Sequence, residues 1–301
     1  MKPFIKWPGG KTSVLKHLLP LVPRTFQMYY EPFLGGGALY FRLAQLRQEG
    51  EMHFGHAFLS DVNANLIEVY LTVRGDVDGL LQILRKMDQA YQKKVALCLQ
   101  EAKDMYLQIR SKNPSTPLDR AARFIFLNKT CFNGLYRENS KGGFNVPFGK
   151  YKTPNIYNPK LFRSAHQLLL DDFLIVSDYT VAGAAKQGDF VYLDPPYFPI
   201  KQCSFTQYGS GQWTVQQHAQ LSEFFRALNT RKVDLVLSNS DTPEVRELYK
   251  NLSVIEIRQN RSIGAKGRVS QRDLLILSDS LAERMGDENV RYQSSGSGAT
   301  S

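Results

Sequence analysis

The tetrapeptide Asp194-Pro195-Pro196-Tyr197 is the most chemically informative stretch of the chain, and it directly follows the apolar run 190–193. Each proline lacks an N–H and has a fixed φ, so the carbonyl groups of Asp194 and Pro195 are expected to point outward, unpaired. The Tyr197 ring adds a flat face for a planar substrate. Acceptors beside a stacking face suit an exocyclic amino group such as N6 of adenine. A proline-rich turn that closes a strand, with Tyr197 as its cover, is the alternative.

A second candidate site is the glycine-rich stretch Glu31–Gly37 (EPFLGGG), which follows an expected strand and precedes an expected helix. Glycines there let the backbone approach a ligand closely, and the helix N-terminus can meet the polar end of that ligand. Gly35 and Gly37 match the start of a dinucleotide fingerprint, but Tyr40 occupies the place of the third glycine. An ordinary tight turn is the alternative.

Asp61 ends the second expected strand, 53–60. A carboxylate at this place can accept two hydrogen bonds from ribose hydroxyls, and its distance along the chain from Gly37 is near the spacing expected for that role. A helix N-cap before the helix that starts near Asn63 explains Asp61 almost equally well.

The N-terminal stretch Trp7–Thr12 (WPGGKT) invites comparison with a phosphate-binding loop. That interpretation fails, because Ile5 stands where such a loop requires a glycine, so no nucleotide triphosphatase is predicted. What remains is an exposed glycine turn with Trp7 and Lys11 on either side, able to stack on a base and to pair with a carboxylate. Trp7 as an anchor of the core is the alternative.

Two further stretches could contact nucleic acid. Residues 128–137 (NKTCFNGLYR) offer Asn, Arg and apolar tips in one turn-rich segment, and residues 142–151 continue it like a hairpin. Because Arg can bind guanine O6 and N7 together and Asn can read adenine, the segment suits base reading, although an ordinary polar hairpin fits as well. Residues 261–268 form a basic loop suited to phosphates.

The sequence lacks the motifs for metal-dependent catalysis and for catalysis by a serine or cysteine nucleophile. The five histidines form no metal-binding motif of the H-E-x-x-H kind, and no G-x-S-x-G is present. None of Cys98, Cys131 and Cys203 has the Pro-Cys context expected for covalent attack on cytosine C5. The sequence therefore predicts direct group transfer without a covalent intermediate and without a metal.

Short apolar runs alternate with helical patterns, which predicts an α/β sheet with crossover connections. The expected strands are 28–33, 53–60, 173–177, 190–193, 234–238, 253–257 and 274–277, and 38–48 is an expected helix. Between the second and third strands, residues 66–110 are helical in pattern and residues 128–159 are rich in loop residues. This middle region is predicted to be an insertion into the sheet domain.

The charge of the chain is positive and unevenly spread. With 301 residues, 43% of them hydrophobic, the chain can form one large domain or two modest ones with a real core. Its net charge is +10; residues 120–163 hold nine Lys or Arg and one acid, and residues 258–272 hold five basic residues and no acid. Two such blocks suit a polyanion such as nucleic acid, although a solvated basic surface has the same composition.

The cellular context is predicted from the cysteines and the chain ends. An odd number of cysteines without metal-type spacing fits a reducing compartment. The first residues lack the apolar core of a signal peptide, and no stretch approaches the length of a membrane span. These features predict a cytoplasmic protein with no membrane association. The tail 283–301, Ser- and Gly-rich at its end, is predicted to be disordered.

Together these segments resemble the Dam-type DNA adenine-N6 methyltransferases, the group with the D12 domain, from about Phe4 to Leu277. The segments that carry the resemblance are, in order, 6–11 (KWPGGK), 31–37 (EPFLGGG), 60–63 (SDVN), 131–137 (CFNGLYR), 144–149 (FNVPFG), 194–197 (DPPY) and 237–240 (LSNS). The resemblance implies a Rossmann-like methyltransferase sheet with helices on both faces and an inserted helical and hairpin target-recognition domain. The catalytic domain would comprise 1–64 and 165–282, and the recognition insertion 65–164.

The resemblance also implies the cofactor and the residues that bind it. S-adenosyl-L-methionine would donate the methyl group and leave as S-adenosyl-L-homocysteine, without a metal. The residues expected to bind it are Trp7, Lys11, Phe33, Gly35, Gly37, Asp61, Asp178 and Asp194. The catalytic residues would be Asp194, Pro195, Pro196 and Tyr197: the target adenine, flipped out of the duplex, would stack on Tyr197 while Asp194 and the Pro195 carbonyl accept hydrogen bonds from N6.

The implied partner is double-stranded DNA. Members of the family with the Asn-Gly-Leu-x-Arg segment commonly methylate adenine in GATC. By that match, Arg137 of this chain is expected to read the guanine. The residues expected to contact DNA are Lys129, Phe132, Asn133, Leu135, Arg137, Pro147, Arg261 and Lys266. The sequence leaves open a cognate restriction endonuclease as a second partner, and the chain is expected to be a monomer or a weak dimer.

Two alternatives remain in view. Methylation of cytosine N4 or of RNA uses the same chemistry, but the Asp rather than Ser in the DPPY tetrapeptide and the DNA-reading insertion argue against it. A DNA-binding module that has lost catalysis belongs to another class, and the intact Asp194, Tyr197, Asp61 and Lys11 argue against that.

Overall fold

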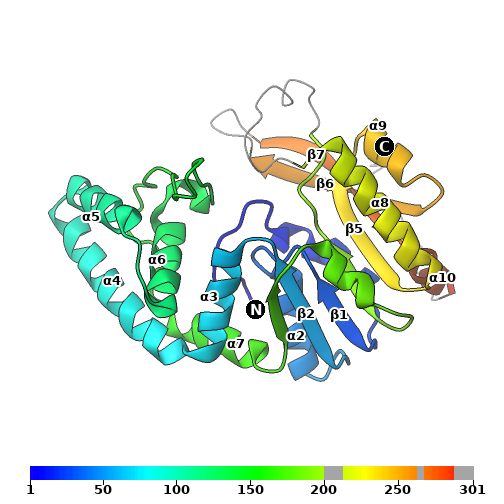
Figure 1. Ribbon diagram of the computed structural model, residues 1–301, viewed down its shortest axis with the longest axis horizontal. Coiled ribbons are helices and arrows are strands. Elements are labelled where there is room, and N and C mark those ends of the chain that lie inside the picture. The colour runs from blue at the N-terminus through cyan, green and yellow to red at the C-terminus, as the bar shows by residue number, and fades with distance from the viewer. Residues whose placement is uncertain (200–212, 263–267, 288–301) are drawn as a thin grey trace, which may run out of the picture.

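A seven-stranded sheet forms the centre of the protein, seen in a computed structural model that describes residues 1–199, 213–262 and 268–287. The strand order is β3-β2-β1-β4-β5-β7-β6 (Figure 1). The strands are β1 (Met28–Glu31), β2 (His56–Asp61), β3 (Phe173–Val176), β4 (Phe190–Leu193), β5 (Asp234–Ser240), β6 (Ser253–Ser262) and β7 (Arg268–Leu277). The first five are parallel, and β7 lies antiparallel to both β5 and β6. The predicted α/β class is confirmed.

The strands match the apolar runs of the sequence, with one systematic difference. β4 has the predicted bounds, whereas β6 and β7 extend well beyond the predicted 253–257 and 274–277. The extra residues pair with one another from Arg258↔Arg272 to Ser262↔Arg268. Backbone pairing extends these strands through residues that have no apolar pattern, so periodicity alone could not show it.

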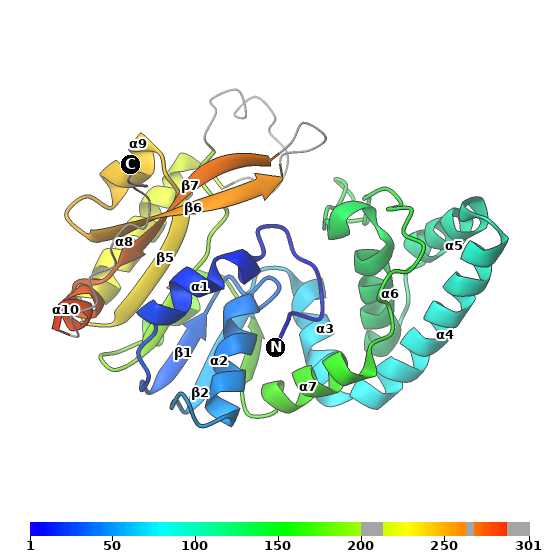
Figure 2. The same cartoon turned by 180° about the vertical axis from the view of Figure 1, so that it is seen from behind.

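Each face of the sheet has its own core, and alternation along the strands assigns residues to one or the other. On β4, Phe190 and Tyr192 belong to one cluster, and Val191 and Leu193 to the other. The helices α1 (Leu15–Leu18), α2 (Ala38–Gln48) and α10 (Asp279–Asp287) contribute to the first cluster, and α8 (Val215–Thr230), α9 (Pro243–Leu248) and the 3-10 segment η4 (Tyr179–Ala184) to the second (Figures 1 and 2). Helices therefore cover both faces, as predicted.

Polar caps set where several helices begin. Asn63 accepts a hydrogen bond from the Leu66 N–H at the start of α3 (Ala64–Gly75), and Asn158 does the same for Leu161 at the start of α7 (Pro159–Leu169). Thr214 and Gln217 form a reciprocal capping box on α8. Such side chains satisfy N–H groups that have no partner in the first turn.

The predicted insertion is helical and lies beside the sheet. The helices α4 (Val77–Leu97), α5 (Leu99–Ser111) and α6 (Pro117–Thr130) stand away from it, with α3 and α7 between (Figures 1 and 2). A short 3-10 turn η3 (Phe132–Gly134) and a loop that extends to Asn158 follow α6. The predicted boundaries at 65 and 164 fall inside α3 and α7, and the division into domains stays a prediction.

The C-terminal helix α10 includes residues 283–287, which differs from the predicted tail starting at 283; residues 288–301 lie outside the described part of the chain. Two 3-10 turns, η1 (Lys11–Ser13) and η2 (Leu19–Leu21), flank α1. In the ranges that the structure describes, no helix has both the length and the apolar character needed to cross a membrane.

Candidate active site

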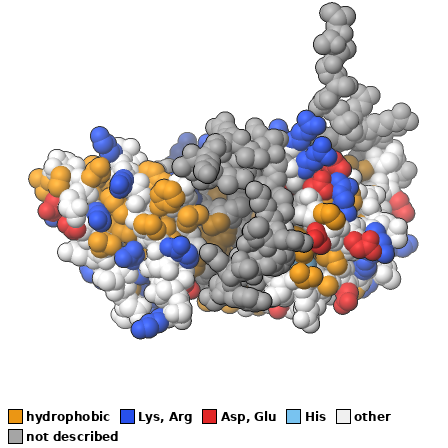
Figure 3. Space-filling view, turned by 90° about the horizontal axis from the view of Figure 1, so that it is seen from above, with side chains coloured by type: hydrophobic (Ala, Val, Ile, Leu, Met, Phe, Trp, Pro, Cys, Tyr) orange, Lys and Arg blue, Asp and Glu red, His pale blue; other side chains and the backbone are white. Residues whose placement is uncertain are grey.

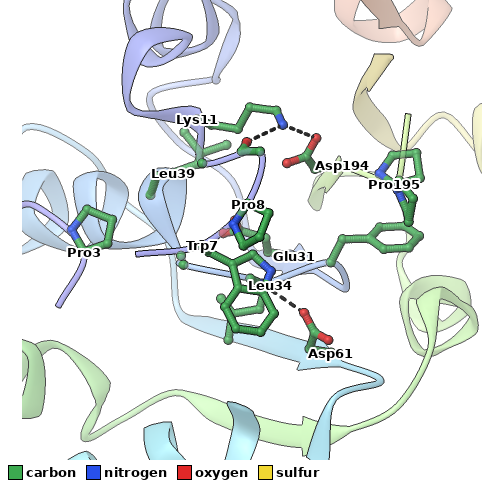
Figure 4. Close-up of a pocket in the computed structure, with 18 of the residues that line it drawn as sticks. Pro3, Trp7, Pro8, Lys11, Glu31, Leu34, Leu39, Asp61, Asp194 and Pro195 are labelled. Atoms are coloured by element: carbon green, nitrogen blue, oxygen red, sulfur yellow. Dashed lines mark hydrogen bonds and ion pairs between the residues drawn. The ribbon is translucent and has the colours of Figure 1, made fainter. Parts of the chain in front are cut away.

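A cavity of about 1050 Å³ opens at the carboxyl ends of β1, β2 and β4, the edge where open α/β sheets bind ligands. The structure brings the predicted catalytic and cofactor residues together in its wall (Figure 4). They are Trp7, Lys11, Phe33, Gly35, Gly37, Asp61, Asp178, Asp194, Pro195, Pro196 and Tyr197. These residues come from five separate segments of the sequence.

Lys11 and Asp194 point toward one another across this cavity (Figure 4). The Lys11 ammonium lies 2.7 Å from Asp194 Oδ1 and donates to the Gly9 carbonyl at 2.8 Å. It also lies 4.7 Å from the centre of the Tyr197 ring, a cation–π distance. The predicted pairing of Lys11 with a carboxylate is therefore observed, and its partner is the Asp of the DPPY tetrapeptide.

A second donor binds the same oxygen of Asp194. The Ser238 hydroxyl at the end of β5 donates to Oδ1 at 2.6 Å, and the Tyr192 hydroxyl lies 3.0 Å from that of Ser238. The neighbouring Asn239 accepts from the Phe198 N–H at 2.9 Å. The segment from Asp194 to Phe198 is thus fixed at both ends by the polar end of β5.

Asp61 organises the glycine turn. Its Oδ2 accepts from the Gly35 N–H at 3.0 Å and its Oδ1 from the Asn63 N–H at 2.9 Å. The cap of α3 is Asn63 rather than Asp61. Burial raises the pKa of the Asp61 carboxyl, and the two N–H donors oppose that rise.

Trp7 fills the space beside this turn. Gly35 has φ +47°, and a Cβ there would lie 2.6 Å from the Trp7 ring, so only glycine fits. The indole also stacks on Tyr136 and on Phe124 of α6, with ring centres 5.3 and 6.3 Å away. Trp7 therefore lines the cavity and also packs against α6 and the loop that follows it, so it combines both interpretations of the sequence.

Aromatic rings close another side of the cavity. Phe33 stacks on Tyr179 at 6.0 Å and meets Trp213 edge-on at 5.4 Å. Asp178 is exposed, and its Oδ1 accepts from the Thr180 N–H at 2.9 Å, which caps η4.

Glu31 forms part of the cavity wall and is almost completely buried, at 3% exposure. Its Oε2 accepts from the Tyr29 hydroxyl at 2.8 Å and from the Tyr40 N–H at 3.0 Å. Burial raises the pKa of Glu31 to about 8, Asp194 adds to the rise, and the Tyr29 hydrogen bond opposes it.

The predicted base-reading segment 128–137 has two parts. Residues 128–130 are buried in the last turn of α6, and the rest belongs to a loop closed by the bridges Cys131↔Phe148 and Glu138↔Phe144. Arg137 donates through Nε to Asn145 Oδ1 at 2.6 Å and through a terminal nitrogen to the Asn145 carbonyl at 3.2 Å. Asn133 adopts φ +55° and lines the cavity, so the loop reaches the site. The side chains of Phe132, Leu135 and Pro147 are exposed on the same loop.

Of the remaining predicted DNA contacts, one is buried and two have side chains outside the described part of the structure. Lys129 is only 8% exposed; burial and the charge of Lys6 lower its pKa to about 8, which does not favour a phosphate contact. Arg261 belongs to β6, but its side chain lies outside the described part, as does all of Lys266. Over the predicted insertion, Lys and Arg side chains border apolar ones (Figure 3).

Sequence reasoning singled out the segments that contain Glu31 and Ser238 but gave neither residue a role in the site, and it did not single out Trp213. Each had a weak signal: an acid at the end of β1, a tryptophan just before a helix, and a polar Ser-Asn-Ser at the carboxyl end of an apolar strand. What the sequence could not supply is which strand neighbours β4. Within the described residues, no three His, Cys, Asp or Glu side chains gather as a metal site, and the absence of a metal requirement stays a prediction.

Comparison with known proteins identifies the family. The model of the D12 class N6 adenine-specific DNA methyltransferases matches residues 7–263. The chain is 36% identical over 280 residues to the type II methyltransferase M.MjaIII of Methanocaldococcus jannaschii, covering 89% of this chain and 94% of the relative. For M1.LlaDCHI of Lactococcus lactis the identity is 34% over 276 residues (88% and 90% covered), and for the DNA adenine methylase of Escherichia coli K12 it is 30% over 279 residues (91% and 94%). With its α/β sheet and its DPPY cavity, this chain belongs to the D12 class of N6 adenine-specific DNA methyltransferases.

Proposed function

We propose that the protein transfers the methyl group of S-adenosylmethionine to N6 of adenine in the duplex sequence GATC, after that adenine has been flipped out of the helix. The observation that carries the proposal is the meeting of the Lys11–Asp194 pair and the Tyr197 ring with the Asp61-bound glycine turn in one cavity. One cavity thereby offers places for a methyl donor and for a planar acceptor.

The residues on the donor side fit S-adenosylmethionine. Asp61 keeps lone pairs for ribose hydroxyls beside the two N–H groups that orient it, and the Phe33 ring offers an apolar face. The turn at Gly35 exposes backbone close to the ligand. When bound, the donor supplies a methyl group on a positively charged sulfur.

On the acceptor side, Asp194 and the Pro195 carbonyl would accept hydrogen bonds from N6 and turn its lone pair toward the methyl carbon. A bond forms between N6 and that carbon as the carbon–sulfur bond breaks, and N6 then releases one proton to solvent. Tyr197, with Lys11 over its ring, would stack on the flipped base. Catalysis of this kind is mainly positioning and electrostatics.

Recognition of GATC is proposed for the loop that carries Arg137. Its guanidinium is exposed yet oriented by Asn145, an arrangement suited to bidentate binding of guanine. The loop contacts the donor side through the Trp7–Tyr136 stack. Arg261 and Lys266 are proposed as phosphate contacts on the sequence alone.

The names of the relatives support a proposal for the cellular role. Two of the three relatives above are named type II methyltransferases, and they share more residues with this chain than the E. coli DNA adenine methylase does. We therefore propose that the enzyme works beside a restriction endonuclease in the cytoplasm. One copy of the chain contains all the proposed site residues, in keeping with a monomer.

Methylation of an unmethylated plasmid, followed by single-molecule sequencing, tests the proposal. We expect modified adenines at GATC and nowhere else, and an Asp194→Ala control without modification. Modified adenines at another site would overturn the GATC assignment, and modified cytosines would overturn the acceptor.

A further inference from the structure

We propose that Ser238 is a positioning residue for methyl transfer, whose hydroxyl, itself oriented by Tyr192, fixes the Asp194 carboxylate for the acceptor amine. The inference rests on the proposed function and adds to it a residue that does not touch the substrate. Ser238 is completely buried at the end of β5, next to β4.

The strand register places the two side chains together. Leu193 on β4 pairs with Leu237 on β5 in a parallel ladder, so the next residues, Asp194 and Ser238, lie side by side. Ser238 Oγ is 2.6 Å from Asp194 Oδ1. A carboxylate can only accept, so the single hydroxyl proton of Ser238 goes to Asp194.

The direction of the next hydrogen bond follows. Because Ser238 has no second proton, the Tyr192 hydroxyl, 3.0 Å away, must donate to Ser238. Burial and the charge of Asp194 raise the pKa of Tyr192 well above its ordinary value, so it stays protonated. The result is a one-way chain from Tyr192 through Ser238 to Asp194, in which each donor strengthens the next.

Both protein donors to the carboxylate bind the same oxygen. The Lys11 ammonium lies 2.7 Å and the Ser238 hydroxyl 2.6 Å from Asp194 Oδ1. The lysine belongs to the N-terminal turn and the serine to β5. As far as the described residues go, this leaves Oδ2 to accept from N6. Two fixed donors on one oxygen restrict rotation of the carboxylate, so the acceptor geometry exists before substrate binds.

The hydrogen bonds from Tyr192 through Ser238 orient the Asp194 side chain, whereas the residues after Ser238 bind the backbone just after the DPPY tetrapeptide. Asn239 accepts from the Phe198 N–H, and the Ser240 hydroxyl donates to the Phe198 carbonyl at 2.5 Å. Removing the Ser238 hydroxyl therefore leaves these anchors of the loop in place. We expect an effect on the reacting group rather than on the fold.

The test compares Ser238→Ala and Ser238→Cys with the full-length wild-type protein. Cys keeps the volume but is a weak donor, so it separates hydrogen bonding from packing. Ser60→Ala is the matched control, since Ser60 is a completely buried serine at the end of β2 whose hydroxyl has no partner among the described residues. The readouts are the single-turnover rate of N6-methyladenine formation, the dissociation constants for S-adenosylmethionine and DNA, and the melting temperature.

We expect Ser238→Ala and Ser238→Cys each to slow the single-turnover rate by about 10- to 100-fold, the effect of losing a hydrogen bond to a charged group. Both dissociation constants should stay within about twofold of wild type, and Ser60→Ala should keep the full rate. Tyr192→Phe should slow the rate by about 2- to 10-fold in the wild type but not further in Ser238→Ala, because it acts through Ser238.

An unchanged rate in Ser238→Ala, or a loss of rate matched by losses of both bindings, would overturn the positioning role. If Tyr192→Phe and Ser238→Ala slowed the rate additively in the double variant, the proposed hydrogen-bond chain from Tyr192 through Ser238 to Asp194 would be wrong. A wild-type protein that forms no N6-methyladenine would instead refute the proposed function, and the inference with it.

Discussion

The Lys11 ammonium lies 2.7 Å from Asp194 Oδ1, and so joins the N-terminal turn to the end of β4. The two side chains are 10% and 16% exposed, so water screens the pair only in part. The same cation lies over the Tyr197 ring. One lysine therefore orders both functional groups of the DPPY tetrapeptide.

Replacing that lysine tests its positioning effect. Lys11→Met should slow methyl transfer by about 10- to 100-fold, since it removes one charged donor from the carboxylate and the cation above Tyr197. The measurement is the single-turnover rate, with the exposed Lys16→Met as the matched control. If both variants lost activity equally, net charge rather than the Asp194 contact would be the cause.

Asp61→Ala should weaken donor binding more than DNA binding. The change removes the proposed ribose acceptor and frees the Gly35 N–H, so we also expect a loss of about 1–2 kcal/mol in unfolding free energy. Titration of intrinsic fluorescence can follow the donor, because both tryptophans, Trp7 and Trp213, line the cavity. Unchanged donor affinity would contradict the role of Asp61, and the exposed Asp171→Ala serves as the control.

Glu31 predicts a pH dependence of stability. Its pKa is about 8 in the folded protein against an ordinary value of 4.5, so between these values the folded state keeps a proton that the unfolded state releases. Its contribution to stability is therefore highest at low pH and declines as pH rises through this window, and above it the folded state must hold a buried charge.

Glu31→Gln should remove this decline. Denaturant unfolding from about pH 5 to about pH 9 should show the variant gaining on the wild type as pH rises. Two curves that stay parallel over the range would show that Glu31 is ionised in the folded protein.

Arg137→Ala should lower discrimination at one guanine of the site by about 1–3 kcal/mol if the contact is bidentate. The measurement is kcat/KM on a duplex with the full site and on duplexes with a single substituted base pair. Lys141→Ala, also exposed on this loop, is the control and should act uniformly or not at all. A uniform loss in Arg137→Ala would instead indicate a phosphate contact.

Much of the site was predictable because its parts lie next to strong patterns. The apolar run 190–193 ends at the DPPY tetrapeptide, and parallel strands bring their carboxyl ends to one edge, which places Asp61 and Asp194 in the same cavity. The sequence also indicated that Lys11 could meet a carboxylate.

The rest depended on contacts that no local pattern encodes. Ser238 acts on Asp194 only because β5 lies beside β4, and the position of β7 between β5 and β6 is likewise a non-local pairing. Lys129 was expected to contact DNA, yet packing in the last turn of α6 buries it. Burial of a lysine is a tertiary property that composition does not reveal.

The most direct measurement is methylation of a GATC-containing duplex by the wild-type protein and by Asp194→Ala, with nucleosides identified by mass spectrometry and DNA binding measured in parallel. The account predicts N6-methyladenine from the wild type, and none from Asp194→Ala although this variant still binds DNA. Methyl groups on cytosine, or N6-methyladenine formed by Asp194→Ala at the wild-type rate, would contradict it.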